Sequence, residues 1–176
     1  LDRLAAMGTS FENCMSNSPV CVPARVGLAT GNQPFRCGSV DNMSYLPRSA
    51  TTYYQRLRDY GYRVGCVGKL DLAKPDPYNG RYGDRPCVYT WGFTHPEECE
   101  GKFHAGRHAE PVGPYTHYLR EHGLLETFHE DYNRRGVQGP EGGADPSPLP
   151  CEHFEDSYIG RRAAEWIEKT PNDFPW

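Results

Sequence analysis

The sequence predicts an α/β fold with a parallel sheet flanked by helices, and two neighbouring segments are the main reason. Residues 50–60 place aromatic and apolar side chains at helical spacing, and Gly61 follows as a natural end of this helix. Residues 62–67 then form a short, largely apolar run that predicts a strand. A helix that leads directly into such a strand is typical of α/β folds, in which the sheet is parallel.

The beginning of the chain predicts a short helix and a strand. Residues 1–7 have apolar side chains at helical spacing, and Gly8 is suited to end that helix. Residues 9–16 form a candidate strand that carries Phe11.

A second helix is predicted after a turn-rich segment. Pro23 suits a first helical turn, because the N–H that proline lacks would be unpaired there in any case. The helix continues over residues 24–30, and Gly31 is a favourable residue just past its end. Cys21 is therefore expected immediately before a helix N-terminus.

The helix over 50–60 and the strand over 62–67 bring Lys69 to the edge of the sheet where ligands bind. Ser49 is the candidate N-cap of the helix over 50–60. The side of this helix that faces the core is predicted to hold Tyr53, Tyr54, Leu57 and Tyr60. Lys69 follows the strand over 62–67 at its carboxyl end, where parallel sheets bind their ligands.

The rest of the chain is predicted to alternate long loops with helices. Residues 32–47, 73–113 and 136–150 show little periodicity and are predicted as loops. Helices are predicted over 114–121, 127–135 and 156–169. Asp156 is the candidate cap of the last helix. Its inward side is predicted to hold Tyr158, Ile159, Ala163, Trp166 and Ile167.

Composition excludes two classes of partner. The chain has 176 residues, a formal net charge of −4 and 37% hydrophobic residues, and its 19 Gly and 16 Pro favour loops. An acidic balance offers no broad basic surface for nucleic acid. No apolar run approaches the roughly 20 residues that a membrane-spanning helix needs. We therefore expect no nucleic-acid partner and no membrane span.

The seven cysteines favour free thiols over a disulfide framework. Their number is odd, and no two have the spacing of a Cys-only zinc motif. Cys66 lies in an apolar run and is predicted to be a small buried side chain. The surplus of thiols favours the cytoplasm over the periplasm or secretion, whereas the sequon Asn42-Met43-Ser44 points towards the secretory pathway.

The segment CVPARVGLATG, from Cys21 to Gly31, carries the strongest chemical signal. It places a thiol at a helix N-terminus with Arg25 four residues further on. The positive end of the helix and the guanidinium group both favour an anion at this point. The residues alone leave two interpretations open: a reactive or anion-binding site, and a buried Cys before an ordinary helix with Arg25 in solvent.

The pattern C-x-P-x-R followed by Thr-Gly resembles the signature of the type I sulfatases, in the alkaline-phosphatase-like superfamily. Residues 1–11 resemble the helix and strand that precede the nucleophile in that family, and residues 18–20 resemble the segment that leads into it. The motifs GYRV and GK, within residues 61–69, resemble the family's strand that ends in GKxH. The helix over 156–169 followed by Phe174 resembles the helix before the next sheet strand.

The resemblance implies a fold and an extent for the domain. The fold is an alkaline-phosphatase-like three-layer sandwich, with a mainly parallel central sheet flanked by helices. Residues 1–176 would form the N-terminal part of a single sulfatase catalytic domain, with a loop-rich insertion around 73–150. Residues outside this chain would complete the site, so the segment alone is expected to be inactive.

The resemblance also implies a chemistry. In the family, the motif is recognised by the formylglycine-generating enzyme, which oxidises the Cys to an aldehyde. One hydroxyl of the hydrated aldehyde attacks the sulfur of the ester and releases the alcohol, and the other then expels sulfate. A divalent cation, Ca²⁺ in the first place and otherwise Mg²⁺ or Mn²⁺, polarises these groups. The implied substrate is a small-molecule or carbohydrate sulfate ester.

Roles follow for four residues. Cys21 would be the precursor of the nucleophile and, as formylglycine, a cation ligand, with the other ligands outside residues 1–176. Arg25 would hold the diol, and Lys69 would bind the sulfate and stabilise charge in the transition state. Asp71 stands where the family usually has His. Because a carboxyl group protonates a leaving group near neutral pH only when its pKa is strongly raised, Asp71 is expected to contact the substrate instead.

Three alternatives remain open. Asp71 in place of His is compatible with a phosphonate or phosphate monoester or diester hydrolase of the same superfamily. A non-catalytic sulfatase-like binding domain would keep Cys21 as a thiol. A loop-rich metal-binding module would use Cys99, His104 and His108, although the glycine between the two histidines favours a loop over a helix. The remaining histidines are expected at exposed structural positions: His95, His117, His122, His129 and His153.

Overall fold

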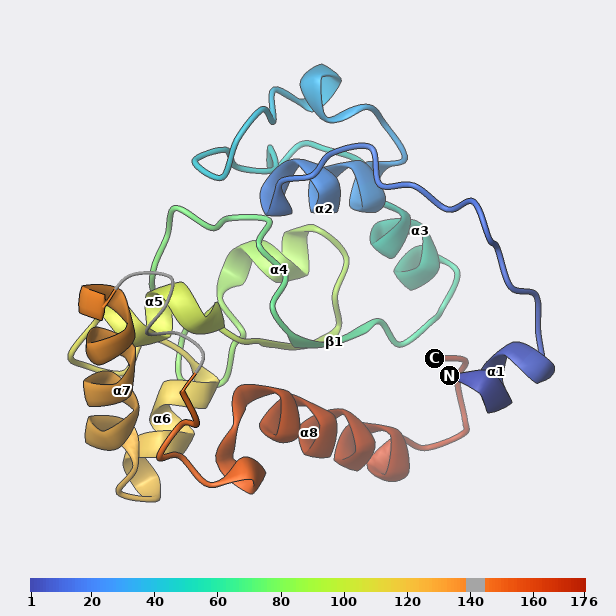
Figure 1. The fold of residues 1–176 in the computed structure, drawn as a ribbon. Coiled ribbons are helices and arrows are strands. Elements are labelled where there is room, and N and C mark those ends of the chain that lie inside the picture. The colour runs from blue at the N-terminus through green and yellow to red at the C-terminus, as the bar shows by residue number, and fades with distance from the viewer. Residues whose placement is uncertain (139–144) are drawn as a thin grey trace.

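A computed structural model describes residues 1–138 and 145–176, and within them it shows a two-stranded parallel sheet between helices (Figure 1). The elements are α1 (Asp2–Ala6), α2 (Cys21–Thr30), η1 (Pro34–Cys37), α3 (Tyr53–Asp59), β1 (Gly65–Gly68), α4 (Pro86–Thr90), β2 (His95–Glu98), α5 (Gly101–Arg107), α6 (Pro114–Glu121), α7 (Leu125–Gln138), η3 (Cys151–His153) and α8 (Glu155–Lys169). β1 and β2 pair in parallel, with Gly65 opposite His95. The predicted α/β class with a parallel sheet is confirmed.

Helices cover both faces of the sheet. α2, α3 and α4 lie on one side of β1, and α8 lies on the other (Figure 1). On the α8 side, a Cβ atom added to Gly65 would lie 2.9 Å from the ring of Trp166, and one added to Gly68 would lie 3.3 Å from Ile159. Because glycine leaves this space open, α8 packs directly on the strand backbone. The layers are therefore helix, sheet and helix, as the three-layer prediction requires.

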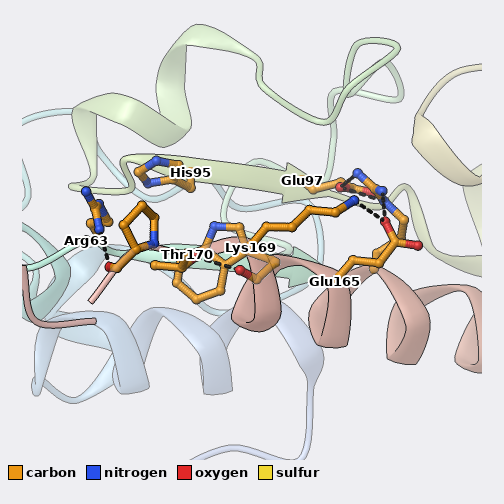
Figure 2. A pocket seen from close by; sticks show the side chains of 9 residues that line it. Arg63, His95, Glu97, Glu165, Lys169 and Thr170 are labelled. Carbon is orange, nitrogen blue, oxygen red and sulfur yellow. Dashed lines mark hydrogen bonds and ion pairs between the residues drawn. The ribbon is translucent and has the colours of Figure 1, made fainter. Parts of the chain in front are cut away.

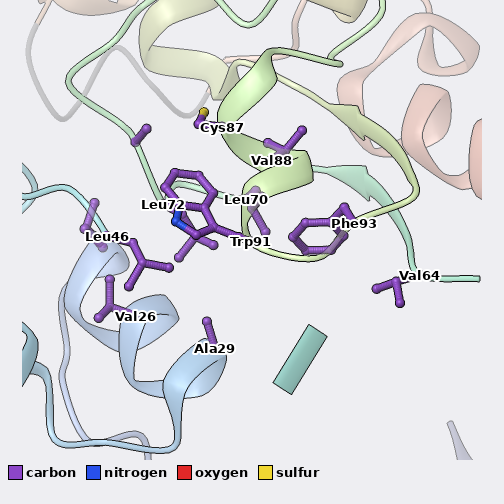
Figure 3. Close-up of a cluster of buried hydrophobic side chains, with 12 residues drawn as sticks. Val26, Ala29, Leu46, Val64, Leu70, Leu72, Cys87, Val88, Trp91 and Phe93 are labelled. Atoms are coloured by element: carbon purple, nitrogen blue, oxygen red, sulfur yellow. The ribbon is translucent and has the colours of Figure 1, made fainter. Parts of the chain in front are cut away.

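The main hydrophobic core lies between α2, α4 and the sheet (Figure 3). Val26 and Ala29 of α2 and Val88 of α4 are fully buried, and Trp91, at the end of α4, is 1% exposed. The indole Nε1 of Trp91 donates to the carbonyl oxygen of Pro47 at 3.3 Å. A fully buried valine such as Val26 or Val88 contributes roughly 1.5–3 kcal/mol. This core holds α2, and with it Cys21, against the sheet.

A second hydrophobic cluster joins α5, α6 and α8 at one end of the sheet. Ala105 of α5, Leu119 of α6 and Tyr158 of α8 are buried in it. None of the helices in the described ranges combines the length with the apolar character that crossing a bilayer requires.

The N-terminal region differs from the prediction in one element. Residues 9–16, predicted as a strand, have no regular structure, and Phe11 is exposed. No strand of the described ranges lies beside them, and an isolated extended segment is not stable in water. Cys21 is the first residue of α2 rather than the residue before it, and Val20 is the N-cap. Gly31 ends α2 with a φ of 68°, as predicted.

Thr52, and not Ser49, caps α3. The Thr52 hydroxyl accepts the backbone N–H of Gln55 at 3.1 Å, and the Gln55 side chain accepts the N–H of Thr52 at 3.1 Å. This capping box starts the helix at Tyr53, three residues later than predicted. Tyr53 and Tyr60, which were predicted to face the core, are both exposed.

The loop predicted over 73–113 is wrong, because that stretch contains α4, β2 and α5. α6 has the predicted bounds, and α7 is longer than predicted at both ends. Phe154 is the N-cap of α8, so Asp156 lies inside the first turn, and Ile167 is exposed rather than inward. Residues 139–144 of the loop predicted over 136–150 lie outside the described residues.

Candidate active site

α2 borders an open hollow of about 760 Å³ along most of its length. Cys21 and Arg25 line the hollow from the helix, and residues 14–20 line it from the segment before the helix. A Cβ atom at Gly27 would overlap the side-chain amide of Asn17, so glycine at this position lets the two segments approach. The hollow is therefore formed by the helix and by the chain that leads into it.

Cys21 is half-buried at the first position of α2. Its thiol is free, and across residues 1–138 and 145–176 it makes no hydrogen bond. At the next position, the backbone N–H of Val22 donates to Oδ1 of Asn42 at 3.1 Å, so the asparagine of the sequon contacts the first turn of α2. No side chain accepts a hydrogen bond as the N-cap of α2. The N–H of Val22 is therefore occupied and Pro23 has none, so among the first three residues of α2 only the N–H of Cys21 is without a partner in the described ranges.

Arg25 connects α2 to the end of β1. Its Nη1 donates to the carbonyl oxygen of Lys69 at 2.6 Å. The side chain is half-buried, and no carboxylate of the described residues forms an ion pair with it. The interpretation that placed Arg25 in solvent is wrong. A half-buried guanidinium group without a counter-ion favours an anion in the hollow that it shares with Cys21.

Lys69 lies at the carboxyl end of β1, as predicted, and forms an ion pair with Asp71. Lys69 Nζ lies 3.0 Å from Oδ2 of Asp71, and Lys74 Nζ lies 3.2 Å from the same oxygen. Asp71 is buried, and its φ of 58° is the only positive φ among the described non-glycine residues. Aspartate tolerates this left-handed conformation better than most residues, and such strain often occurs at functional sites.

A buried ion pair between Arg85 and Glu98, which the sequence did not predict, supports the loop that contains Asp71 and Lys74. Arg85 binds Glu98 of β2 through two hydrogen bonds, of 2.7 Å and 2.8 Å, and Glu98 is 1% exposed. Burial raises the pKa of Glu98, while Arg85 and the backbone N–H of Asp71 act in the opposite direction. Arg85 Nη1 also donates to the carbonyl oxygen of Ala73 at 3.2 Å. The pair therefore holds the backbone between Asp71 and Lys74.

Two further carboxyl groups near Lys69 were not predicted. Oε1 of Glu100 accepts the backbone N–H of Thr116 at 2.7 Å, while Oε2 has no hydrogen-bond partner in the described ranges. Burial raises the pKa of Glu100. Burial and the neighbouring Glu100 raise the pKa of Glu155 to about 7, against the attraction of Lys69 and the N–H of Gly101. Neither glutamate belongs to a sequence motif, so only the tertiary structure reveals them.

The structure brings some predicted site residues together and keeps others apart. Arg25 contacts Lys69, and Lys69 contacts Asp71. Cys21 shares a hollow with Arg25 but makes no hydrogen bond to Lys69 within the described ranges. Direct contacts therefore link Arg25, Lys69 and Asp71, and Cys21 is connected to them only through the hollow that it shares with Arg25.

The alternative metal site is not assembled. His104 and His108 lie at and just beyond the end of α5, with ring centroids 6.2 Å apart, and Cys99 is buried. The predicted loop is thus a helix. Burial and the neighbouring His108 lower the pKa of His104. No group of three or more His, Cys, Asp or Glu side chains within residues 1–138 and 145–176 could hold a metal ion.

The other histidines divide into two groups. His95 and His122 are exposed, as predicted. The prediction is wrong for three half-buried ones, namely His117, His129 and His153. A ring nitrogen of His129 lies 3.0 Å from the carbonyl oxygen of Ala105, and Nδ1 of His153 lies 2.7 Å from the hydroxyl of Tyr118.

A second hollow, of about 360 Å³, lies between the strands and α8 (Figure 2). Arg63 and His95 line it at the amino ends of the strands. Its main charges are paired, because Arg162 binds Glu97 through hydrogen bonds of 2.8 Å and 2.7 Å. This hollow lies at the opposite ends of the strands from Lys69 and is separate from the candidate site.

Comparisons with known proteins agree with this geometry. The model of the sulfatase family matches residues 1–101, which include the motifs up to Lys69 that carry the resemblance but not the helix over 156–169. A choline-sulfatase from Rhizobium meliloti is 35% identical over 80 residues, which make up 46% of this chain and 16% of that protein. Arylsulfatase K from Canis lupus familiaris is 35% identical over 73 residues, which make up 42% of this chain and 14% of that protein.

A protein of known structure has a similar fold. The crystal structure of a phosphonate monoester hydrolase from Agrobacterium radiobacter superposes with a TM-score of 0.54 at 20% identity, over 92% of this chain and 31% of that chain. The likeness confirms the predicted alkaline-phosphatase-like fold. The chain spans less than a third of that structure and about a sixth or less of the two relatives. Because the family model matches more than half of its residues, this chain belongs to the sulfatase family.

Proposed function

We propose that the protein hydrolyses sulfate esters with a nucleophile made from Cys21. The observation that carries the proposal is the position of Cys21 at the start of α2, in a hollow that it shares with the half-buried Arg25. A thiol at a helix N-terminus beside an unpaired guanidinium group suits an anionic substrate. Membership of the sulfatase family supports the same reaction.

The proposal includes conversion of Cys21 to formylglycine by a formylglycine-generating enzyme. The side chain is free to be modified, because it has no disulfide and no hydrogen bond in the described ranges. The hollow of about 760 Å³ offers room for a hydrated aldehyde. That group would supply one hydroxyl to attack sulfur and a second to release sulfate.

Arg25 and Lys69 would act on the charges of the reacting group. Arg25 is held by its hydrogen bond to the carbonyl oxygen of Lys69, which leaves its remaining N–H groups for the diol and the sulfate oxygens. Lys69 keeps one side of its ammonium group on Asp71, and its side chain is 33% exposed, so the other side can bind a sulfate oxygen. Fixed donors of this kind stabilise charge that develops in the transition state.

A divalent cation, preferably Ca²⁺ and otherwise Mg²⁺ or Mn²⁺, is part of the proposal. The described residues do not form a cation site by themselves, since no cluster of three potential ligands exists among them. Cys21, as formylglycine, would be the one ligand from this chain, and the others would come from outside residues 1–176.

Hydrolysis of a phosphonate or phosphate ester is the second candidate. One observation favours it: Asp71 stands where sulfatases usually have His, and its Oδ2 is shared by two ammonium groups. The phosphonate monoester hydrolase that shares the fold supports this candidate. A binding domain with an unmodified Cys21 is the non-catalytic alternative.

The chemical state of Cys21 tests the proposal. Trypsin releases a peptide from Leu4 to Arg25 that contains both Cys14 and Cys21. After expression in a host that modifies such motifs, we expect this peptide to have the mass of an aldehyde at Cys21 and to react with a hydrazide. The Cys14→Ala variant should retain the aldehyde, and Cys21→Ala should lose it. An unmodified thiol at Cys21 in that host would favour the binding domain.

Substrates then separate the two catalytic candidates. Full-length protein that carries the aldehyde should hydrolyse aryl or carbohydrate sulfates, and the Cys21→Ala variant should not. Faster turnover of phosphonate monoesters than of sulfates would favour the second candidate.

A further inference from the structure

The loop after β1 gathers two ammonium groups on one carboxylate oxygen, and the proposed reaction uses only one of them. Lys69 and Lys74 both contact Oδ2 of Asp71. The Lys74 side chain is only 16% exposed, although lysine side chains usually extend into solvent. One carboxylate cannot neutralise two ammonium groups, so the trio keeps a positive charge in a partly buried position, where an anion is favoured.

The loop holds Lys74 in place before any ligand arrives. Arg85, fixed by buried Glu98, donates to the carbonyl oxygen of Ala73, the residue before Lys74. The carbonyl oxygen of Leu72 accepts the N–H of Leu46 at 2.8 Å. Such preorganisation lowers the entropy lost when a ligand binds, and it is characteristic of binding sites.

The charges of Lys69, Asp71 and Lys74 favour two separate anions over a single shared one. Both ammonium groups contact the same oxygen of Asp71, so one oxyanion that contacted Lys69 and Lys74 together would lie close to this carboxylate and be repelled by it. An ammonium group has three donors, and Asp71 occupies one on each lysine. The remaining donors of Lys74 are therefore suited to an anionic group other than the one on Lys69.

We propose that Lys74 is a specificity-determining residue, which binds a second anionic group on the alcohol part of the ester while Lys69 binds the sulfate. The substrate class is then a sulfate ester whose alcohol carries a carboxylate or a further sulfate. This inference rests on the proposed function for the role of Lys69.

Binding of non-hydrolysable sulfonates tests the inference without requiring turnover. Benzenesulfonate carries one anionic group, and 4-sulfobenzoate adds a carboxylate. With full-length protein in a calorimeter, we expect 4-sulfobenzoate to bind about tenfold more tightly, as one additional charge-assisted contact would give. Lys74→Met should abolish this preference and leave benzenesulfonate binding within about twofold, a change of less than 1 kcal/mol. Lys74→Arg should retain most of the preference.

Two further variants make the test specific. Lys169→Met removes an exposed lysine at the end of α8, at the other ends of the strands, and should bind both sulfonates as the wild type does. Asp71→Asn removes the competing carboxylate and should strengthen binding of both, which provides a readout should Lys74→Met prove unstable. Equal binding of the two sulfonates by the wild type would overturn the inference, as would a preference that survives in Lys74→Met. A different result would overturn only the proposed function: the wild type prefers 4-sulfobenzoate and Lys74→Met does not, but protein that carries the aldehyde hydrolyses no sulfate ester.

Discussion

Arg25 donates a hydrogen bond from Nη1 to the carbonyl oxygen of Lys69, at 2.6 Å, and so ties the helix that begins with Cys21 to the carboxyl end of β1. The two ends of the candidate site come from segments 44 residues apart in the sequence. A charged donor that meets a backbone carbonyl fixes the position of both partners.

We expect Arg25→Met to reduce both stability and activity. A hydrogen bond to a charged group contributes about 1.5–3 kcal/mol, so the free energy of unfolding should fall by about that amount. Turnover should fall further in Arg25→Met than in Arg25→Lys, since lysine keeps the charge although it lacks the planar donor geometry. Urea unfolding and steady-state kinetics measure the two effects.

Arg56→Met provides the control for that change. Arg56 is an exposed residue of α3, and its replacement should alter the free energy of unfolding by no more than about 0.5 kcal/mol. If Arg25→Met unfolded at the same midpoint urea concentration as the wild type, the bond to Lys69 would not be what holds α2 against β1.

Breaking the buried pair between Arg85 and Glu98 should be the more severe change. Glu98→Gln leaves the Arg85 guanidinium, whose side chain is 9% exposed, without its counter-ion. Loss of one partner from a buried pair lowers the free energy of unfolding by about 3–5 kcal/mol. The exposed pair between Arg58 and Asp59 is the control, and Asp59→Asn should change stability by no more than about 1 kcal/mol. Similar losses in the two variants would contradict the structural role of Glu98.

Much of this architecture could be predicted because local signals marked it. Pro23 and Gly31 mark the two ends of α2, and both positions agree with the structure. The bounds of α6 were predicted correctly, with Pro114 as its first residue. Lys69 could be placed at the carboxyl end of a parallel strand because glycine and apolar residues precede it. Each of these signals depends on residues close together in the sequence.

The features that were missed depend on contacts between distant residues. β2 has the sequence HPEE, which resembles an exposed loop. Its two glutamates are accommodated in a sheet only because Arg85 and Arg162, which come from other elements, neutralise them. The link between Asp71 and Lys74 likewise occurs at a residue with a left-handed backbone, which nothing in the local sequence indicates.

The absence of a side chain at Gly65 should be essential to the contact between β1 and α8. In Gly65→Ala the new Cβ would lie 2.9 Å from the Trp166 ring, so the helix would have to shift, which costs about 1–3 kcal/mol. Thermal unfolding should show this loss. In the double variant with Trp166→Leu the combined cost should be smaller than the sum of the two single costs. Gly160→Ala, within α8 and with no atom within 4 Å of its new Cβ, should instead stabilise by about 0.5–1 kcal/mol.

Glu155 should make the stability of the protein decrease as the pH rises from mildly acidic to neutral. Burial and the nearby Glu100 raise the pKa of Glu155 to about 7 in the folded state, whereas an unfolded glutamate has a pKa of about 4.3. Between these values the folded chain holds a proton that the unfolded chain has released. The free energy of unfolding therefore falls as the pH rises through this window and becomes constant above it.

The Glu155→Gln variant isolates this effect, because glutamine cannot ionise. The free energy of unfolding of this variant minus that of the wild type should increase between about pH 4.5 and pH 7 and remain constant at higher pH. Urea titrations at several pH values measure the difference, and Glu168→Gln, at an exposed position of the same helix, is the matched control. A difference between Glu155→Gln and the wild type that does not change with pH would mean that Glu155 is ionised in the folded protein at mildly acidic pH. In that case its carboxylate would add a negative charge near Lys69 throughout the range.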